Sequence, residues 1–218
     1  MRNMASSASS RGIAAIVGVG PNLGLSIARK FAHEGYTVAI LARDLGRLSR
    51  FADEIAREEK AQVFAIRIDC SDSRSVREAF EGVLSLGFVE ILVYNAYQPL
   101  SSYPTSFQDL RIDSFHKSLA VSSVGAFHCA QQEFQPQGVH VAHVIIDGLI
   151  GPPRGGTLTT SLQRGNSSGE QSSGVVGGGG ESTMDPDALA QTFWHLHVQD
   201  RNAWTQEMDL RSPSVRFF

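Results

Sequence analysis

The feature that most constrains this chain is a regular alternation, from Gly12 onward, between short apolar runs and longer stretches with apolar residues at helical spacing. The short runs are rich in β-branched residues and are typical of strands; they cover residues 13–17, 37–42, 62–68 and 90–96. Parallel strands need a crossover between them, usually a helix, so consecutive βαβ units produce this alternation. We therefore predict an α/β fold with a doubly wound parallel sheet.

The stretches between the strands carry helix signals. Residues 23–35 place apolar residues on one face and end at a glycine. Residues 45–60 repeat this pattern, and Asp72 is placed to cap the helix before the fourth strand. Residues 112–132 predict a fourth helix.

Composition excludes several classes of function. The 218 residues, of which 42% are hydrophobic, predict one domain with a well-buried core. A net charge of -3 without long single-sign runs leads us to expect neither nucleic acid nor an anionic membrane as partner. Cys70 and Cys129 form no CxxC pair, which fits a reducing compartment. No apolar run reaches the roughly 18 to 20 residues that span a bilayer, so we expect a soluble, cytoplasmic protein.

The segment IAAIVGVGPNLGLS joins the first strand to the first helix, and in that context a glycine-rich turn is informative. Gly18 permits a tight turn, Gly20 keeps a side chain out of the path of a phosphate, and Gly24 allows the helix to pack closely on the strand. The helix N-terminus then faces the anion. A tight turn without a ligand is the alternative, but the surrounding strands and helices favour a dinucleotide site.

The spacing from Gly18 to Gly24 resembles the first turn of the short-chain dehydrogenase/reductase family, which reads GxxxGxG, with Asn22 in place of the middle glycine. Asparagine tolerates a left-handed backbone, so the turn is compatible with this substitution. Further resemblances follow in order: LARD after the second strand, IDC with Asp69 after the third, and YNAY where the family often has NNAG. They cover the first two thirds of the family's fold, which is Rossmann-like.

The resemblance implies a set of cofactor-binding residues. It places Asp69 near the adenine amine, and Asn95 with Ala96 along the cofactor. It adds Asn22 and Leu23 of the turn to the three glycines. The implied cofactor is a nicotinamide dinucleotide.

Two neighbouring residues bear on the cofactor type. Arg43 directly follows the second strand, where a guanidinium can hold a ribose 2′-phosphate, while Ala42 leaves the strand end without a carboxylate. Asp44 lies about 20 residues past the last glycine, where an acid would bind a 2′-hydroxyl and select NAD. Because Asp44 is also placed to cap the next helix, we favour NADP and keep NAD as the alternative.

The catalytic groups of the family are not found in this sequence. The resemblance implies a serine at the end of the fifth strand and a YxxxK pair on the next helix, with the tyrosine as acid/base. None of the four tyrosines is followed four residues later by a lysine; they are Tyr36, Tyr94, Tyr97 and Tyr103. Ser122 stands where the family has an active-site asparagine. We therefore predict no catalytic residue.

The missing pair coincides with an apparent internal deletion. GAFHCAQQ resembles the end of the family's fourth helix, whereas EFQPQGVHVAHVIIDG resembles the end of its fifth helix and its sixth strand. We infer that a strand and a helix, roughly 30 residues or more, are missing at about Gln132 and Glu133. The Rossmann-like sheet would then be shortened by one strand and one helix, with residues 139–146 beside the fourth strand.

The remaining chain completes the predicted organisation. We expect a disordered tail over residues 1–11, a nucleotide-binding domain over 12–154, and a flexible Gly/Ser-rich loop over 155–183. Residues 184–218 would form a C-terminal helix and tail packed on the same domain, with Asp185 as its N-cap. The paired histidines at 140/143 and 195/197 point to opposite or different faces, so we predict no metal site.

Three hypotheses for function remain. The leading one is an NADP(H)-binding member of the oxidoreductase family that is inactive as a reductase and is a truncated product of a longer enzyme. The second is an active NADP-dependent enzyme that uses Tyr94 or Tyr97 as a substitute acid. The third is a regulatory partner of a full-length reductase, in a homo- or hetero-oligomer formed through the fourth helix.

Overall fold

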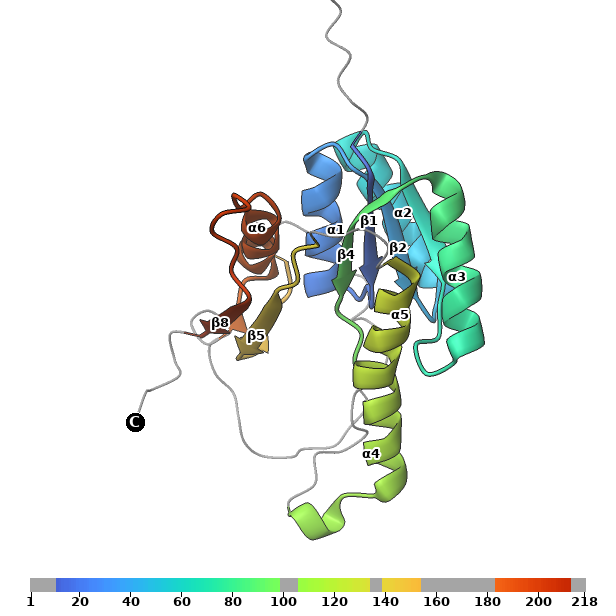
Figure 1. Ribbon diagram of the computed structural model, residues 1–218, viewed down its shortest axis with the longest axis vertical. Helices are drawn as coiled ribbons and strands as arrows, with labels where there is room; N and C mark the ends of the chain where they lie inside the picture. The colour runs from blue at the N-terminus through green and yellow to red at the C-terminus, as the bar shows by residue number, and fades with distance from the viewer. Residues whose placement is uncertain (1–10, 99–105, 134–138, 154–182, 213–218) are drawn as a thin grey trace, which may run out of the picture. The chain divides into compact units, whose positions relative to one another are not determined.

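A parallel sheet of four strands forms in the N-terminal part of the chain, as the alternation predicts (Figure 1). The computed structural model describes residues 11–98, 106–133, 139–153 and 183–212. The strands follow the order β3-β2-β1-β4, and their bounds are β1 (Ile13–Val17), β2 (Thr37–Ala42), β3 (Val63–Arg67) and β4 (Val89–Tyr94).

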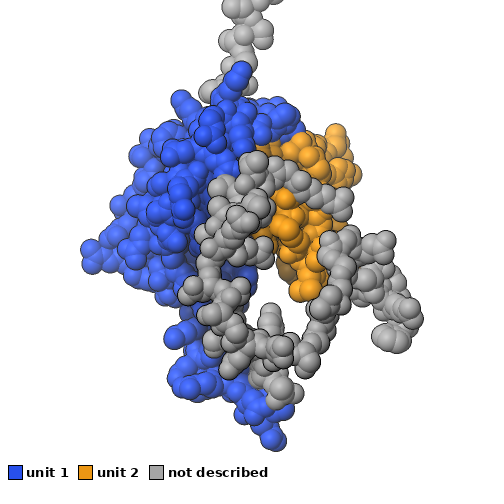
Figure 2. Space-filling view, turned by 180° about the vertical axis from the view of Figure 1, so that it is seen from behind, with its two compact units in different colours: residues 1–19, 31–136 blue, residues 20–30, 137–218 orange. Residues whose placement is uncertain are grey.

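The chain divides into two compact units (Figure 2). The first unit comprises residues 1–19 and 31–136, and it contains the whole four-stranded sheet. The second unit comprises residues 20–30 and 137–218. Helix α1 (Leu23–His33) carries residues of both units, and its Leu25, Ile27 and Ala28 are buried.

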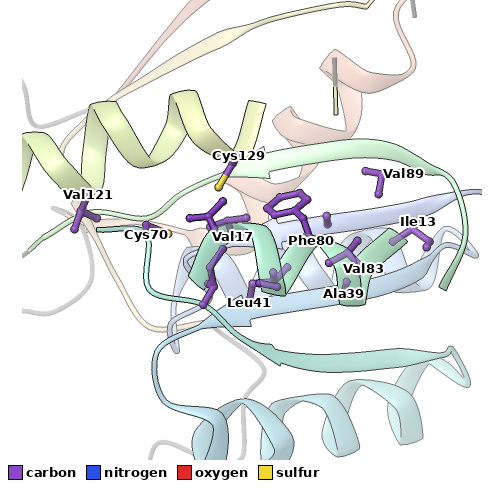
Figure 3. Close-up of a cluster of buried hydrophobic side chains, with 14 residues drawn as sticks. Ile13, Val17, Ala39, Leu41, Cys70, Phe80, Val83, Val89, Val121 and Cys129 are labelled. Atoms are coloured by element: carbon purple, nitrogen blue, oxygen red, sulfur yellow. The ribbon is translucent and has the colours of Figure 1, made fainter. Parts of the chain in front are cut away.

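The two inner strands of the sheet form the core of the first unit. All five residues of β1 are buried, because β1 pairs with β2 on one side and with β4 on the other. Both faces of such a strand are covered, and the continuous apolar run IAAIV is typical of that position. A cluster of buried side chains fills the space between the sheet and the helices α3 (Ser73–Leu86) and α5 (Gly125–Glu133) (Figure 3); it includes Val17, Leu41, Phe80, Val83 and Cys129.

Aspartate caps fix the starts of the helices that follow β2 and β3. The Asp44 carboxylate accepts a hydrogen bond from the Arg47 amide at 3.0 Å and begins α2 (Leu45–Glu59). The Asp72 carboxylate accepts from the Arg74 amide at 2.9 Å and begins α3 (Ser73–Leu86), as predicted. Each cap satisfies an amide that the helix itself leaves without a partner.

The predicted fourth helix is one continuous rod with a change of winding in its middle (Figure 1). It consists of α4 (Ile112–Leu119), a π-helical segment η2 (Ala120–Val124) and α5 (Gly125–Glu133), and a short 3-10 turn η1 (Phe107–Asp109) precedes it. The Tyr94 hydroxyl donates a hydrogen bond to the Val121 carbonyl, inside the π-helical segment. Only the change of winding was not predicted.

The second unit contains two small parallel sheets and a helix. Strand β5 (His143–Asp147) pairs with β8 (Glu207–Arg211), and β6 (Leu149–Ile150) pairs with β7 (Thr183–Met184). Helix α6 (Pro186–His197) begins at the predicted N-cap, where the Asp185 carboxylate accepts from the Asp187 amide at 3.0 Å.

The expectation that residues 139–146 lie beside the fourth strand is wrong. Strand β5 pairs with β8 in a sheet of its own, whereas β4 pairs with β1. Both strands of the pair alternate exposed and half-buried residues, and the half-buried Val144, Ile146, Met208 and Leu210 share one face. The parallel pairing places Val144 beside Met208 and Ile146 beside Leu210, so the two strands present one continuous apolar face.

Several predicted segments fall outside the described residues. The expected tail over 1–11 does so except for Arg11, and the expected loop over 155–183 does so except for Thr183. The inferred deletion near Gln132 stays a prediction, as does the packing of residues 184–218 on the N-terminal domain.

The turn at Gly18 gives a test of the fold. Gly18 has a φ of +88°, and a Cβ added there would lie 2.5 Å from the Ala96 Cα. Gly35 has the same φ of +88°, but a Cβ there would meet nothing within 4 Å. We expect Gly35→Ala to lower the free energy of unfolding by about 1 kcal/mol through backbone strain alone. Gly18→Ala adds a clash with backbone and should lower it by about 3 kcal/mol or more.

Urea unfolding of both variants, followed by circular dichroism, measures the two losses. Equal losses in the two variants would show that the close approach of Gly18 to the chain after β4 does not stabilise the fold.

Candidate functional site

Four strand ends meet at one edge of the sheet in the first unit. Because all four strands are parallel, the residues that follow them lie along the same carboxyl edge. These residues are Gly18 after β1, Arg43 after β2, Asp69 shortly after β3, and Asn95 after β4. The strand order reverses between β1 and β4, since the chain moves outward from β1 to β2 and β3 and then returns to the other side. Ligands of open α/β sheets bind at such a switch point.

Hydrogen bonds of Gly18 and Asn95 join the chain segments that meet at this switch point. The Gly18 amide donates to the Leu41 carbonyl at 2.8 Å, and the Asn95 side-chain amide donates to the Gly18 carbonyl at 3.1 Å. The Asn95 backbone amide also donates to the Val17 carbonyl, at 2.8 Å. Asn95 therefore braces the glycine turn, and the lack of a Gly18 side chain lets Ala96 approach it.

The residues that follow Gly18 in the turn belong to the second unit. A Cβ added at Gly20 would meet nothing within 4 Å, so the space beside this backbone is open. The Asn22 carbonyl accepts from the Ser26 amide at 3.1 Å, so Asn22 is the residue that directly precedes α1 and accepts one of its first hydrogen bonds. Leu23 and Gly24 are buried.

No acidic residue lies in the first turn of α1. The positive end of the helix dipole is therefore not neutralised by a neighbouring carboxylate from that turn. Open space at Gly20 and a helix N-terminus without an acid are two properties that favour an anion at such a turn.

Arg43 and Asp44 have different surroundings. Arg43 is exposed, and its guanidinium reaches the Gln98 side-chain oxygen at 3.5 Å. The Asp44 carboxylate caps α2 through the Arg47 amide and lies 3.8 Å from the Arg47 guanidinium. The structure thus shows the capping role for Asp44 that the sequence left open.

Asp69 is held as an ionised acceptor. Its Oδ1 accepts from the Ser71 amide at 3.0 Å and from the Ser71 hydroxyl at 2.7 Å. These two hydrogen bonds, and the charge of Arg43, hold the pKa of Asp69 below its usual value. Ser75 braces the same turn by accepting from the Asp69 amide at 2.9 Å. Such a carboxylate is suited to accept a hydrogen bond from an amine.

Ser71 and Ser75 were not identified from the sequence. The spacing of Asp69 and Ser71 is the pattern of a turn in which an aspartate accepts from the residue two positions on, so a local signal existed. Gln98 was missed because its contact with Arg43 joins segments far apart in the sequence. No sequence spacing reveals such a contact.

The candidate substitute acids differ in accessibility. The Tyr94 hydroxyl donates to the Val121 carbonyl, and burial raises the pKa of Tyr94 above its usual value. A phenol held in this way gives up its proton less readily than a free one. Tyr97 is 70% exposed. Ser122 and Ser123 are exposed on the π-helical segment.

The histidines considered as metal ligands contact other groups. The His140 ring stacks on Trp204 at 4.8 Å between ring centroids, and its Nε2 lies 2.6 Å from the Thr205 carbonyl. His143 Nδ1 lies 3.3 Å from the Glu207 carboxylate. Within the described ranges, no group of three or more potential ligands is arranged to hold a metal ion.

Comparisons with curated proteins point to oxidoreductases. The chain is 30% identical over 122 residues to sorbitol-6-phosphate 2-dehydrogenase of Escherichia coli, which covers 55% of this chain and 46% of that protein. It is 32% identical over 117 residues to retinol dehydrogenase 12 of Bos taurus, which covers 53% of this chain and 35% of that protein. The match thus spans less than half the length of these relatives.

Solved structures show the same fold. An alcohol dehydrogenase from Thermococcus sibiricus, complexed with 5-hydroxy-NADP, superposes with a TM-score of 0.73 and 20% identity over 95% of this chain and 100% of that one. A metagenomic short-chain oxidoreductase in complex with NADP gives a TM-score of 0.69 and 16% identity over 94% and 98% of the two chains. At these identities the likeness shows the fold, which is the predicted α/β Rossmann-like fold.

The part of the chain that the structure describes contains no helix with the length and apolarity needed to cross a bilayer.

The family profile described as short chain dehydrogenase matches residues 12–144, more than half of the chain. That span includes the glycine turn, Arg43, Asp69 and Asn95. The chain therefore belongs to the short-chain dehydrogenase family.

Proposed function

We propose that this protein binds NADP(H) at the carboxyl edge of its four-stranded sheet. The observation that carries the proposal is the switch point between β1 and β4, where Gly18, Asn95 and Ala96 form a tightly braced turn. Family membership and solved relatives that hold NADP or an NADP derivative support it.

The residues fit the parts of such a cofactor. Gly20 leaves open space for a phosphate, and the turn residues Asn22, Leu23 and Gly24 would offer backbone amides at the start of α1. Asp69, kept ionised by Ser71, would accept a hydrogen bond from the adenine amine. A bound nicotinamide supplies hydride chemistry; the protein's residues bind and orient it.

Arg43 favours NADP over NAD. Its exposed guanidinium follows β2, where it would pair with a 2′-phosphate. The carboxylate that would instead bind a 2′-hydroxyl, Asp44, is occupied as the cap of α2. The two residues thus divide their roles: Arg43 is available for the ligand, and Asp44 supports the helix.

We further propose that the protein is inactive as a carbonyl reductase. No tyrosine in the sequence has a lysine four residues later. The inferred deletion after the fourth helix would account for this loss and would make the chain a truncated product of a longer reductase. Of the substitute acids, Tyr94 is held by Val121, so the alternative of an active enzyme depends on the exposed Tyr97.

A third proposal concerns a protein partner. The rod formed by α4 to α5 exposes large apolar side chains on its surface; they are Ile112, Phe115, Leu119, Val124 and Phe127. Exposed apolar surface of this kind is typical of an interaction site. A homo- or hetero-oligomer formed through this helix, with a second copy or a full-length reductase, would cover it. A protein that stays monomeric in sedimentation, alone and with that reductase, would exclude the proposal.

Replacing Arg43 tests the cofactor preference. We expect Arg43→Leu to weaken NADPH binding by about tenfold or more, because it removes a charge-assisted contact to phosphate. NADH binding should change little. Isothermal titration with both cofactors measures the two effects.

Asp44→Asn is the matched control, because asparagine also caps helices but carries no charge. It should leave the ratio of the two affinities unchanged. A loss of NADH binding in Asp44→Asn, with Arg43→Leu unaffected, would identify the site as one for NAD.

Gly20→Ala tests the phosphate path. An added Cβ meets no protein atom within 4 Å, so the free energy of unfolding should stay within about 0.5 kcal/mol of the parent. NADPH affinity should fall by about tenfold, because the methyl group occupies the space proposed for the phosphate. Gly82→Ala, inside α3, is the control. Its added Cβ would meet only the Ile66 Cδ1, at 3.8 Å, so NADPH affinity should not change, while the free energy of unfolding should rise by up to about 1 kcal/mol because alanine favours a helix over glycine. Unaltered NADPH affinity in Gly20→Ala would contradict the proposed position of the phosphate.

Turnover tests the proposed inactivity. The purified protein should bind NADPH, as a rise in melting temperature that depends on cofactor concentration, and should not oxidise it with a panel of aldehydes and ketones. Oxidation above the background rate would overturn the inactive assignment. Tyr94→Phe and Tyr97→Phe would then identify which phenol supports it.

A further inference from the structure

Both cysteines of the chain lie in one buried cluster of the first unit (Figure 3). Cys70 follows β3 in the turn that also carries Asp69, and Cys129 lies on α5. They are 7% and 0% exposed, and both are free thiols. In Figure 3 the Cys129 side chain points from the helix into the cluster.

Helix α5 lies directly against Cys70. A Cβ added at Gly125, the first residue of α5, would be 2.6 Å from the Cys70 carbonyl oxygen and 2.9 Å from the Cys70 Cβ. Gly125 and Cys129 are four residues apart, so they lie on the same face of the helix, about 6 Å apart along its axis. The missing side chain at Gly125 thus brings the Cys70 turn against the face of α5 that also carries Cys129.

The two side chains interact. The neighbouring Cys129 thiol lowers the pKa of Cys70 below its usual value, and Cys70 in turn raises the pKa of Cys129. Other groups face Cys70 as well: the Tyr94 hydroxyl of β4 and Arg43 favour its thiolate, while Asp69 opposes it. Cys70 is the more exposed of the two thiols and the one whose pKa is lowered, so we assign it as the nucleophile of the pair.

We propose that Cys70 and Cys129 form a reversible redox site that closes an intramolecular disulfide. The oxidant is a small disulfide of the glutathione class. The Cys70 thiolate attacks one sulfur of that oxidant, and the other sulfur leaves as a thiolate.

Local opening of the cluster then lets Cys129 lose its proton to solvent and attack the mixed disulfide at the Cys70 sulfur. The Cys70–Cys129 bond forms, and the second small thiolate leaves. Two electrons pass from the protein thiols to the oxidant, and excess small thiol reverses both steps.

The bond would join the turn after β3 to α5. Asp69 immediately precedes Cys70, and its carboxylate is positioned by the hydrogen bonds from Ser71. A covalent link at Cys70 restricts this turn, so oxidation would alter the affinity for the adenine end of the cofactor. This consequence rests on the proposed function, whereas the disulfide itself does not.

Thiol trapping tests the disulfide. The full-length reduced protein is incubated with oxidised and reduced glutathione at fixed ratios, alkylated, and weighed intact by mass spectrometry. We expect a species that lacks two hydrogens, carries no alkyl group and reverts with excess thiol. A peptide digest should then join Cys70 to Cys129.

The folded contact should speed closure of the ring. We expect the native protein to form the bond at least about tenfold faster than the same chain in urea, because the fold raises the effective concentration of the two thiols. Cys70→Ser and Cys129→Ser should each give at most one glutathione adduct. The proposal would be overturned if the native parent kept two free thiols or stopped at the glutathione adduct. It would also be overturned if the disulfide formed no faster in the native parent than in urea.

A binding measurement separates this site from the cofactor proposal. The oxidised parent should differ from the reduced parent in NADPH affinity by at least about threefold, and the double variant Cys70→Ser/Cys129→Ser should not respond to oxidant. If neither form binds NADPH, the proposed function fails while the mass measurement still decides the disulfide. Equal affinities in the two forms would refute the coupling of the disulfide to the cofactor.

Discussion

The structure of the N-terminal unit depends on the close approach between Gly18 and the chain that leaves β4. A positive φ lets the backbone turn at the end of β1, and the absence of a side chain admits Ala96. Hydrogen bonds from the Gly18 amide to Leu41 and from Asn95 to the Gly18 carbonyl then connect the ends of three neighbouring strands. The carboxyl edge of the sheet is thereby held in one arrangement before any ligand binds, which reduces the ordering that binding requires.

Three charged side chains at this carboxyl edge of the sheet, Arg43, Asp44 and Asp69, each contact a different neighbour. Arg43 extends into solvent beside Gln98, whereas Asp44 is retained by the first turn of α2. Asp69 remains ionised because Ser71 donates to it twice. The arrangement offers a cation for a phosphate and an anion for an amine, which suits a phosphorylated dinucleotide. The same turn brings Cys70 against α5, so the proposed redox site and the proposed cofactor site share a short segment.

Local signals were enough to predict the sheet and its helices. Apolar runs, helical periodicity and the caps at Asp72 and Asp185 each depend on residues close together in the sequence. Strand β8 was not predicted, because EMDLR is short and polar and becomes a strand through pairing with β5, far away along the chain. The π-helical winding likewise accompanies a tertiary hydrogen bond from Tyr94. In the candidate site, the sequence was enough to predict the types of residue. Only the structure showed that Asp44 caps α2 instead of being available to a ligand.

The central claim is that the carboxyl edge of the four-stranded sheet binds NADP(H), and hydrogen–deuterium exchange tests it most directly. With saturating NADPH, backbone amides in the turn from Gly18 to Gly24, at Arg43, at Asp69 and at Asn95 to Ala96 should exchange more slowly. Strands β5 and β8 should exchange at their original rates. Protection confined to β5, β8 or α6, or unchanged exchange throughout the protein at saturating cofactor, would contradict the account.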